Sequence, residues 1–420
     1  ENGYNRFFHT DAEKDVVNLI HATRNHPCIV MWSSGNEVPD QWGSEGVKRA
    51  KWLQDLFHRE DPTRPVTVGM DQVKATMASG FGAVLDVPGL NYRTHLYEDA
   101  YKQFPQGFIL GSETASTVSS RGIYKFPVVK GIEKTYDDHQ CSSYDLEYCS
   151  WSNLPEEDFI LQDKKDWTIG QFVWTGFDYL GEPTPYDNYW PSRSSYFGIN
   201  DLAGLPKDRY YLYRSQWNTQ NNTLHILPHW NWEGREGQTT PIFVYTNYES
   251  AELFINGKSM GVRRKNDSSP QSRYRLMWMD VKYEPGTVKV VGFNKNGSPA
   301  TEETIVTSGK PYKLVLEADR SIIDADGKDI SFVTVSVVDD KGNPCPTATN
   351  QLSFKVTGNG VYRAACNGDA TSLERFHLPT MKLFSGKLVV LVQSTTSPGD
   401  IKLSVRGEGL KNGELLLKAE

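Results

Sequence analysis

The hydrophobic pattern of this chain changes near residue 222, and that change limits the possible folds more than any other feature. Before it, apolar residues at helical spacing alternate with short apolar runs, which predicts helices and buried strands. After it, apolar and polar residues alternate along segments such as 241–261 and 286–297, which is typical of strands with one buried face. The sequence therefore predicts an α/β region followed by an all-β region.

The α/β region contains five short buried runs separated by helices or long loops. The predicted strands are 29–32, 65–70, 84–92, 107–112 and 171–174. The clearest predicted helices are 44–59, 155–165 and 208–217. Alternation of this kind indicates a parallel sheet with helices outside it. Polar or aromatic residues follow each strand, as expected where active residues gather at the carboxyl ends of a sheet.

The all-β region divides at a second point. Asn256-Gly257 and Asn296-Gly297 are hairpin signals, and residues 309–311, Gly-Lys-Pro, form a plausible linker. We therefore expect a β-sandwich over residues 222–309 and a second over 310–420, both immunoglobulin-like, after an α/β domain over 1–221.

Composition excludes several classes of function. The formal net charge is −7, which argues against a basic nucleic-acid surface. No run of about 18 apolar residues exists to span a membrane, and no signal peptide is visible. The five cysteines have no motif spacing, so we expect mostly free thiols. We assign no metal and expect no cofactor.

Two glutamates stand near strand ends, where side chains can face a common cleft. Glu37 follows one predicted strand and Glu113 follows another. Hydrolysis of a glycosidic bond needs two carboxyl groups, one to protonate the leaving oxygen and one to attack the anomeric carbon. The competing interpretation is an ordinary rim carboxylate paired with an arginine, and the strand pattern alone does not decide between them.

Longer motifs around these glutamates resemble a known family. Residues 25–37, NHPCIVMWSSGNE, resemble the acid/base signature of glycoside hydrolase family 2, except that Cys28 replaces the usual serine. Residues 108–114, FILGSET, resemble its nucleophile segment. Residues 172–186 and 195–205 are similar to the last barrel strand and following loop of the β-galactosidase branch. The resemblance covers nearly all of residues 5–220 and implies the C-terminal half of a TIM barrel.

The resemblance also implies roles for single residues. Glu37 would be the general acid and base, and Glu113 the nucleophile of a retaining mechanism. Asn36 would bind the sugar's 2-hydroxyl, Tyr92 would orient the nucleophile, and Trp174 would form the floor of the glycone subsite. An oligosaccharide or other glycan would be the substrate.

Other candidates have structural explanations of at least equal weight. Asp178, like the neighbouring Glu182, follows the last predicted strand and either touches sugar hydroxyls or makes structural hydrogen bonds. His95 lies near Tyr92, where a solvent-facing loop position is favoured over a cleft position. For Trp230 and Trp232 we expect packing near the domain boundary rather than sugar binding.

The resemblance places Glu37 after the fourth barrel strand, yet this segment begins only about 25 residues into the chain. We therefore expect that three strands and the upstream domains are missing, and that residues 1–420 alone are inactive or poorly soluble.

The leading hypothesis is a retaining exo-β-galactosidase. The alternatives are a β-glucuronidase or β-mannosidase of the same family, or a non-catalytic carbohydrate-binding protein. The loop after Trp174 has no Asn-x-Lys element of the kind usual in the glucuronidase branch, which counts against that activity. By analogy we expect a bacterial periplasmic or secreted protein, and the sequence leaves open whether it forms a homo-oligomer.

Overall fold

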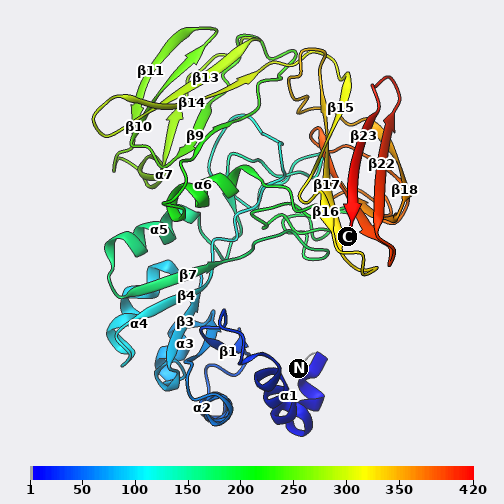
Figure 1. Ribbon diagram of the computed structural model, residues 1–420. Helices are drawn as coiled ribbons and strands as arrows, with labels where there is room; N and C mark the ends of the chain where they lie inside the picture. The colour runs from blue at the N-terminus through cyan, green and yellow to red at the C-terminus, as the bar shows by residue number, and fades with distance from the viewer. Residues whose placement is uncertain (1–2) are drawn as a thin grey trace. The chain divides into compact units, whose positions relative to one another are not determined.

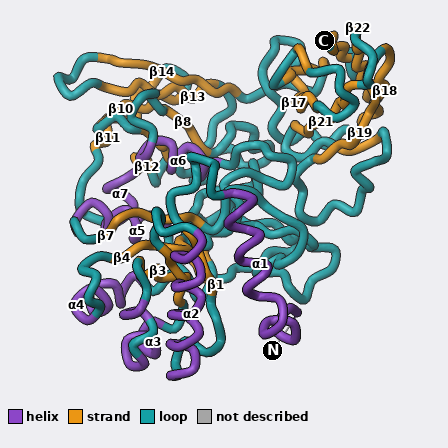
Figure 2. The backbone as a smooth tube through the Cα atoms, turned by 60° about the horizontal axis from the view of Figure 1, so that its bottom comes forward, coloured by secondary structure: helices purple, strands orange, loops and turns teal. Residues whose placement is uncertain are grey.

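The computed structural model describes residues 3–420, which form two compact units. Within the described residues, the N-terminal unit contains residues 3–116 and Ser150–Trp174, and the C-terminal unit contains Thr117–Cys149 and Thr175–Glu420. Most helices belong to the N-terminal unit, whereas the C-terminal unit consists largely of strands and loops (Figures 1 and 2).

The N-terminal unit is built on a parallel sheet whose strand order, β1-β2-β3-β4-β7, follows the chain. Figure 1 shows β1, β3, β4 and β7 of this sheet one beside the next in that order. The strands are β1 (Trp32–Asn36), β2 (Val66–Met70), β3 (Val87–Asn91), β4 (Ile109–Thr114) and β7 (Thr168–Val173). Because all five run in one direction, their carboxyl ends lie at one edge of the sheet.

Helices between the strands cover the sheet and complete its core. They are α1 (Phe8–Thr23), α2 (Ser44–Glu60), α3 (Val73–Ser79), α4 (Tyr97–Gln103) and α5 (Pro155–Lys164), with short 3-10 turns at Gly3–Phe7, Gly82–Val84 and Thr94–Leu96. Helix α2 contacts β1, and α4 and α5 contact β4. The buried strand residues Val68, Leu90 and Ile109 pack with helix residues such as Ala50 and Ala100.

The first strand does not lie where the sequence pattern predicts it. The predicted strand was 29–32, whereas β1 runs from Trp32 to Asn36. Ile29 packs against a small cluster that contains Ile20, Trp32 and Val66, so its apolar character comes from packing before the strand begins. Pairing with β2 starts where the Trp32 N–H donates to the Pro65 carbonyl at 3.0 Å.

The fourth strand is also shifted, and the shift changes the setting of Glu113. The predicted strand was 107–112, but β4 continues to Thr114. Glu113 therefore lies within the strand and is paired with Asn91 of β3, rather than on the loop that follows. The hydrogen-bonded ladder fixes its backbone.

Strands β8 to β14 of the C-terminal unit, between Leu224 and Val306, form two sheets that pack as a β-sandwich. One sheet has the order β11-β10-β13-β14 and the other β12-β9-β8. The strands are β8 (Leu224–Leu227), β9 (Ile242–Thr246), β10 (Ser250–Ile255), β11 (Lys258–Arg264), β12 (Arg275–Trp278), β13 (Thr287–Phe293) and β14 (Pro299–Val306), with α7 (Pro270–Tyr274) before β12. Residues from both sheets, including Val244, Leu253 and Trp278, share one core. The predicted Asn256-Gly257 turn joins β10 to β11, with both residues at positive φ.

Strands β15 to β23, between Lys313 and Ala419, form a second sandwich with sheets β15-β17-β21-β19 and β16-β23-β22-β18-β20. Its strands are β15 (Lys313–Ala318), β16 (Ile322–Ile323), β17 (Ile330–Val338), β18 (Gln351–Gly358), β19 (Gly360–Cys366), β20 (Thr380–Lys382), β21 (Lys387–Ser394), β22 (Gly399–Gly407) and β23 (Gly413–Ala419). Val335, Val390 and Leu403 are fully buried members of its core.

A loop-rich part of the C-terminal unit contacts this second sandwich, and the buried Arg121 makes several of the hydrogen bonds between them. This part includes Thr117–Cys149, with the short strands β5 (Gly131–Ile132) and β6 (Glu147–Tyr148), and helix α6 (Asp208–Trp217). Arg121 donates through Nε to Asp201 at 2.5 Å and through Nη2 to the carbonyls of Asn367 and Phe384 at 2.8 and 2.9 Å. One guanidinium therefore joins the two parts.

In residues 3–420, no helix is long and apolar enough to cross a membrane. All five cysteines are free thiols: Cys141, Cys149 and Cys345 are buried, Cys366 is half-buried and Cys28 is exposed.

Candidate active site

Four candidate side chains lie at the carboxyl edge of the parallel sheet. Asn36 is the last residue of β1, and Glu37 follows it directly. Tyr92 follows β3 directly, and Glu113 lies one residue before the end of β4. The sheet order therefore brings these residues together, although up to about 80 residues separate them in the chain.

Asn91, the last residue of β3, connects the other members of the group. Its Nδ2 donates to Asn36 Oδ1 at 2.8 Å, to Glu37 Oε1 at 3.0 Å and, more weakly, to Glu113 Oε2 at 3.4 Å. Its Oδ1 accepts from Ser112 Oγ at 2.7 Å, which fixes the orientation of the amide. Asn91 is completely buried, whereas Asn36 and Glu37 are exposed. The buried amide of Asn91 thus donates hydrogen bonds to both glutamates.

Tyr92 holds the opposite side of Glu113. Its hydroxyl donates to Glu113 Oε1 at 2.6 Å and therefore accepts from Ser116 Oγ, also at 2.6 Å. The side chain of Trp151 makes a further hydrogen bond to this phenol. Burial, followed by the charge of Glu113, raises the pKa of Tyr92 well above its usual value. The phenol consequently stays protonated and remains a donor to Glu113.

The backbone leaves the ordinary strand geometry at Glu37 and at Tyr92. Both have positive φ, 47° and 55°, which is unfavourable for residues other than glycine. Each nevertheless keeps one ladder hydrogen bond, from Glu37 N to Gly69 O at 2.8 Å and from Tyr92 N to Glu113 O at 2.7 Å. Strained conformations of this kind cluster at functional sites, where the surrounding structure enforces them.

Gly69 on β2 makes room for the two asparagines. A Cβ atom at this position would lie 2.4 Å from Asn36 Oδ1 and 2.6 Å from Asn91 Oδ1. Both distances are well inside van der Waals contact, so any larger residue would displace an amide. The glycine is thus needed for the arrangement of the site.

Trp174 and His95 belong to the same unit. Trp174 follows β7 directly, is half-buried, and its backbone N–H donates to Thr114 O at 2.9 Å, so it too stands at the carboxyl edge. His95 lies in the 3-10 turn Thr94–Leu96, is exposed, and lines a cleft together with Arg93.

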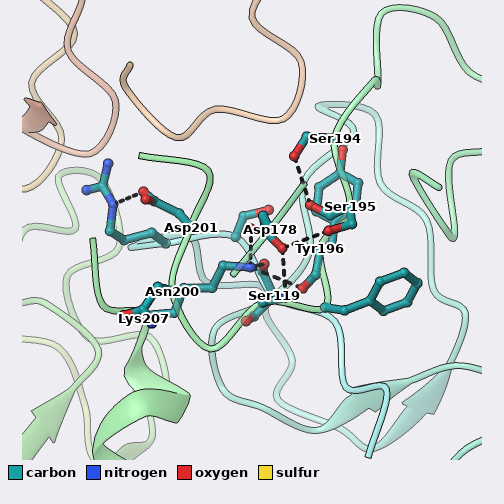
Figure 3. A network of polar contacts seen from close by, with 12 residues as sticks. Ser119, Asp178, Ser194, Ser195, Tyr196, Asn200, Asp201 and Lys207 are labelled. Atoms are coloured by element: carbon teal, nitrogen blue, oxygen red, sulfur yellow. Dashed lines mark hydrogen bonds and ion pairs between the residues drawn. The ribbon is translucent and has the colours of Figure 1, made fainter. Parts of the chain in front are cut away.

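Asp178 belongs to the C-terminal unit, where it is buried in a polar network (Figure 3). Its Oδ2 pairs with Lys207 Nζ at 2.6 Å, and its Oδ1 accepts from Gly198 N at 2.7 Å and Ser195 Oγ at 3.2 Å. Lys207 Nζ also donates to the carbonyls of Ser119 and Tyr196. Burial raises the pKa of Asp178 to about 6, although Lys207 opposes the shift. These contacts are of the kind expected if Asp178 makes structural hydrogen bonds rather than touching sugar hydroxyls.

The aromatic pair near the start of the first sandwich packs internally. Trp230 is fully buried in the sandwich core, and Trp232 stacks on His229 with ring centroids 4.3 Å apart. His225 bonds Asp208 at 2.7 Å. Nowhere in the described part of the chain do three or more His, Cys, Asp or Glu residues form a group suited to a metal ion.

Sequence reasoning missed Asn91 and Trp151. Asn91 stands beside Tyr92 at a strand end, a position that could have marked it, but an uncharged amide gives no chemical signal by itself. Trp151 lies about 60 residues further along the chain, so only the fold reveals its contact with Tyr92.

Three segments of the chain match known domain families. Residues 5–189 match the family "Glycosyl hydrolases family 2, TIM barrel domain", and residues 314–415 match "Glycoside hydrolase family 2 C-terminal domain 5". Residues 237–301, between them, match a domain of unknown function, DUF4982.

Among relatives, the beta-galactosidase BoGH2A of Bacteroides ovatus is 41% identical over 99% of this chain and 52% of its own length. A putative beta-glucuronidase of Formosa agariphila is 28% identical over 92% of this chain and 38% of its own length. The crystal structure of a beta-glycosidase from Bacteroides vulgatus superposes with a TM-score of 0.83, at 30% identity, over 99% of this chain and 54% of that one. The chain therefore spans about half the length of such relatives or less. With two family 2 domains matched and a relative this similar along the whole chain, the protein belongs to glycoside hydrolase family 2.

Proposed function

We propose that the full-length protein is a retaining exo-β-glycosidase that removes terminal β-D-galactosyl residues from glycans. Glu37 is the general acid and base, and Glu113 is the nucleophile. The glycone is proposed from the 41% identical relative named beta-galactosidase and from the galactosidase-like motif at residues 172–186.

The hydrogen bonds of Asn91 carry this proposal. Nδ2 of Asn91 contacts Glu37 Oε1 at 3.0 Å and Glu113 Oε2 at 3.4 Å. These two carboxylate oxygens can be no further apart than the sum of the two distances. That limit reaches only the lower end of the range, roughly 6.5–9.5 Å, found in inverting enzymes, and it includes the roughly 5–5.5 Å of retaining enzymes. The contact of one amide with both carboxylates therefore supports direct attack and retention.

The reaction proceeds in two displacements. In the first, an oxygen of Glu113 forms a bond to the anomeric carbon while the bond to the leaving oxygen breaks, and Glu37 gives its proton to that oxygen. In the second, Glu37 takes a proton from water, the water oxygen bonds to the anomeric carbon, and the bond to Glu113 breaks. Two inversions give net retention.

The surrounding residues support these steps. Tyr92 donates to Glu113 and so keeps one nucleophile oxygen in place. Asn91 can donate to Glu37 in both protonation states, because a protonated carboxyl group still accepts at its carbonyl oxygen. Asn36, held by Asn91, presents its amide where it can bind the 2-hydroxyl, and Trp174 forms the glycone floor.

Azide rescue tests the two roles separately. Glu113→Gly in the full-length protein should lose hydrolysis of an aryl β-galactoside, and azide should restore turnover with an α-galactosyl azide as product. Glu37→Ala with azide should instead give the β-galactosyl azide, because the glycosyl–Glu113 intermediate still forms. Product anomers are read by proton NMR. Identical anomers from both variants, or full activity of Glu113→Gly, would contradict the assignment.

The second candidate is β-glucuronidase activity, favoured by the names of several relatives, including the one from Formosa agariphila. A panel of aryl β-galactoside, β-glucuronide and β-mannoside separates these activities by kcat/KM. A carbohydrate-binding protein without catalysis would hydrolyse none of the three while still binding one of them.

Further parts of the proposal concern organisation. We place domain boundaries near residues 221 and 309, with an immunoglobulin-like form for both sandwiches; the matched ranges 237–301 and 314–415 fall within these limits. A periplasmic or secreted location and a homo-oligomeric state are proposed by analogy. Cell fractionation and light scattering of the full-length protein test them.

A further inference from the structure

A cleft of about 720 Å³ opens at the carboxyl edge of the parallel sheet, and its lining residue Trp151 hydrogen-bonds to Tyr92 of the candidate site. The residues that give it chemical character are Asp71, Lys74, Arg93, His95, Ser150 and Trp151. All of them belong to the N-terminal unit. None has a role in the two displacement steps, so the function of the cleft is a separate question.

The position of the cleft relates it to the bond that is broken. Asp71 directly follows β2, and Arg93 follows β3 after Tyr92. These two strands lie between β1, which positions Glu37, and β4, which contains Glu113. Asp71 and Arg93 therefore lie at the carboxyl edge, at the ends of the two strands between those that position the glutamates. A leaving group beyond the scissile oxygen must also be accommodated at this edge.

Trp151 forms a fixed, half-buried wall of this cleft. Its carbonyl accepts from Arg93 Nη1, and its side chain hydrogen-bonds to the Tyr92 phenol, which itself donates to Glu113. The adjacent Ser152 accepts from the backbone N–H of Ser116 at 2.7 Å. A rigid indole of this kind offers an apolar face at low entropic cost, which suits the apolar face of a sugar ring.

The charges of the cleft are predominantly positive. Lys74 is exposed and Arg93 is half-exposed, and in the part of the chain that the structure describes neither forms an ion pair. The single carboxylate of the lining, Asp71, is occupied by Gln41 Nε2 at 2.7 Å. The two cations, Lys74 and Arg93, outnumber this one carboxylate in the lining, and such groups are well suited to bind a carboxylate or sulfate group.

Resting on the proposed function, we infer that this cleft is the leaving-group subsite and that it selects leaving-group sugars carrying an anionic substituent, either a uronate carboxylate or a sulfate ester. Trp151 contacts the ring of that sugar, and Lys74 and Arg93 bind its anionic group. The enzyme thus acts on acidic glycans in which a neutral terminal sugar is attached to an acidic one.

The test compares leaving groups on one glycone in the full-length protein. The glycone is the one whose aryl β-glycoside the protein hydrolyses. It is linked to glucose, to glucuronic acid or to 6-O-sulfated glucose, and kcat/KM is measured for each. Lys74→Glu is the variant, because Lys74 is exposed and makes no contact with the catalytic group. Lys51→Glu is the matched control, since Lys51 lies exposed on α2 and pairs only with Asp55.

Lys74→Glu should lower kcat/KM for the anionic leaving groups roughly five- to tenfold, because an attractive surface charge becomes repulsive. The same variant should change values for glucose and aryl leaving groups less than twofold, and Lys51→Glu should change none. Loss with only the uronate, or only the sulfate ester, identifies the group that the cleft binds. Equal loss with every substrate, or no loss with either anionic one, overturns the inference. A wild-type protein that hydrolyses no aryl glycoside refutes the proposed function instead.

Discussion

Replacing Asn91 by alanine tests the arrangement of the site most directly. The change removes a neutral hydrogen bond to Asn36 at 2.8 Å and one to the Glu37 carboxylate at 3.0 Å, besides the weak contact to Glu113 at 3.4 Å. A neutral bond contributes about 1 kcal/mol and one to a charged group about 1.5–3 kcal/mol. If the bonds to Asn36 and Glu37 both act fully in the transition state, removing them raises its free energy by about 2.5–4 kcal/mol. This corresponds to a roughly 10²- to 10³-fold decrease in kcat/KM.

The assay is hydrolysis of an aryl β-galactoside by the full-length protein, with thermal unfolding to verify that the variant is folded. Ser112→Ala is the matched control, because it removes only the bond from Ser112 Oγ to Asn91 Oδ1 at 2.7 Å. That single neutral bond predicts a loss of about fivefold. A folded Asn91→Ala enzyme that loses no more activity than Ser112→Ala would refute the view that this amide holds the two glutamates.

Three other predictions follow from packing and charge. Gly69→Ala should lower kcat/KM at least tenfold with little effect on expression, because the new Cβ meets the amide oxygens of Asn36 and Asn91; an active variant with unchanged kinetics would contradict this. Burial raises the pKa of Asp158 to about 7, above its unfolded value, so the buried charge costs stability increasingly as pH rises from about 4 to 7. Asp158→Asn should therefore gain stability relative to wild type over that range, by up to ~4 kcal/mol at pH 8, and calorimetry showing a pH-independent difference would exclude it. Lys207→Met should destabilise the protein by about 3–5 kcal/mol at pH 8, because it leaves the buried Asp178 carboxylate without its cation. The loss should be smaller at pH 5, where that carboxylate can be protonated. Equal unfolding temperatures of the variant and the wild type at pH 8 would show that the pair contributes nothing.

Most elements of the fold could be predicted where the hydrophobic periodicity agrees with the turn and capping residues at the ends of the elements. The helix predicted over 208–217 has the same bounds as α6. The hairpin predicted from Asn256-Gly257 is present, and both residues have positive φ. The position of β1 was predicted wrongly, because Ile29 packs against a cluster before the strand begins and Val30 is exposed, while the strand itself, WSSGN, is mostly polar. A strand whose side chains face a functional edge does not show the apolar signal of a core strand.

The candidate site was accessible from sequence only in part. Glu37 and Glu113 could be selected because carboxylates near strand ends combine with long family motifs. Asn91 could not be selected, because its importance arises from three hydrogen bonds that form only when β1, β3 and β4 lie side by side. Likewise, only the fold reveals that Asp178 is used by a buried lysine within its own unit.

The buried guanidinium of Arg121 has a consequence for how this gene can be shortened. A truncation before residue 310 would delete the Asn367 and Phe384 carbonyls and leave Arg121 with Asp201 alone in a cavity open to water. The C-terminal sandwich is therefore not a detachable module that expression work or domain shuffling can discard freely. A shortened gene would need a compensating change at position 121, and a smaller neutral residue there is the first one to try.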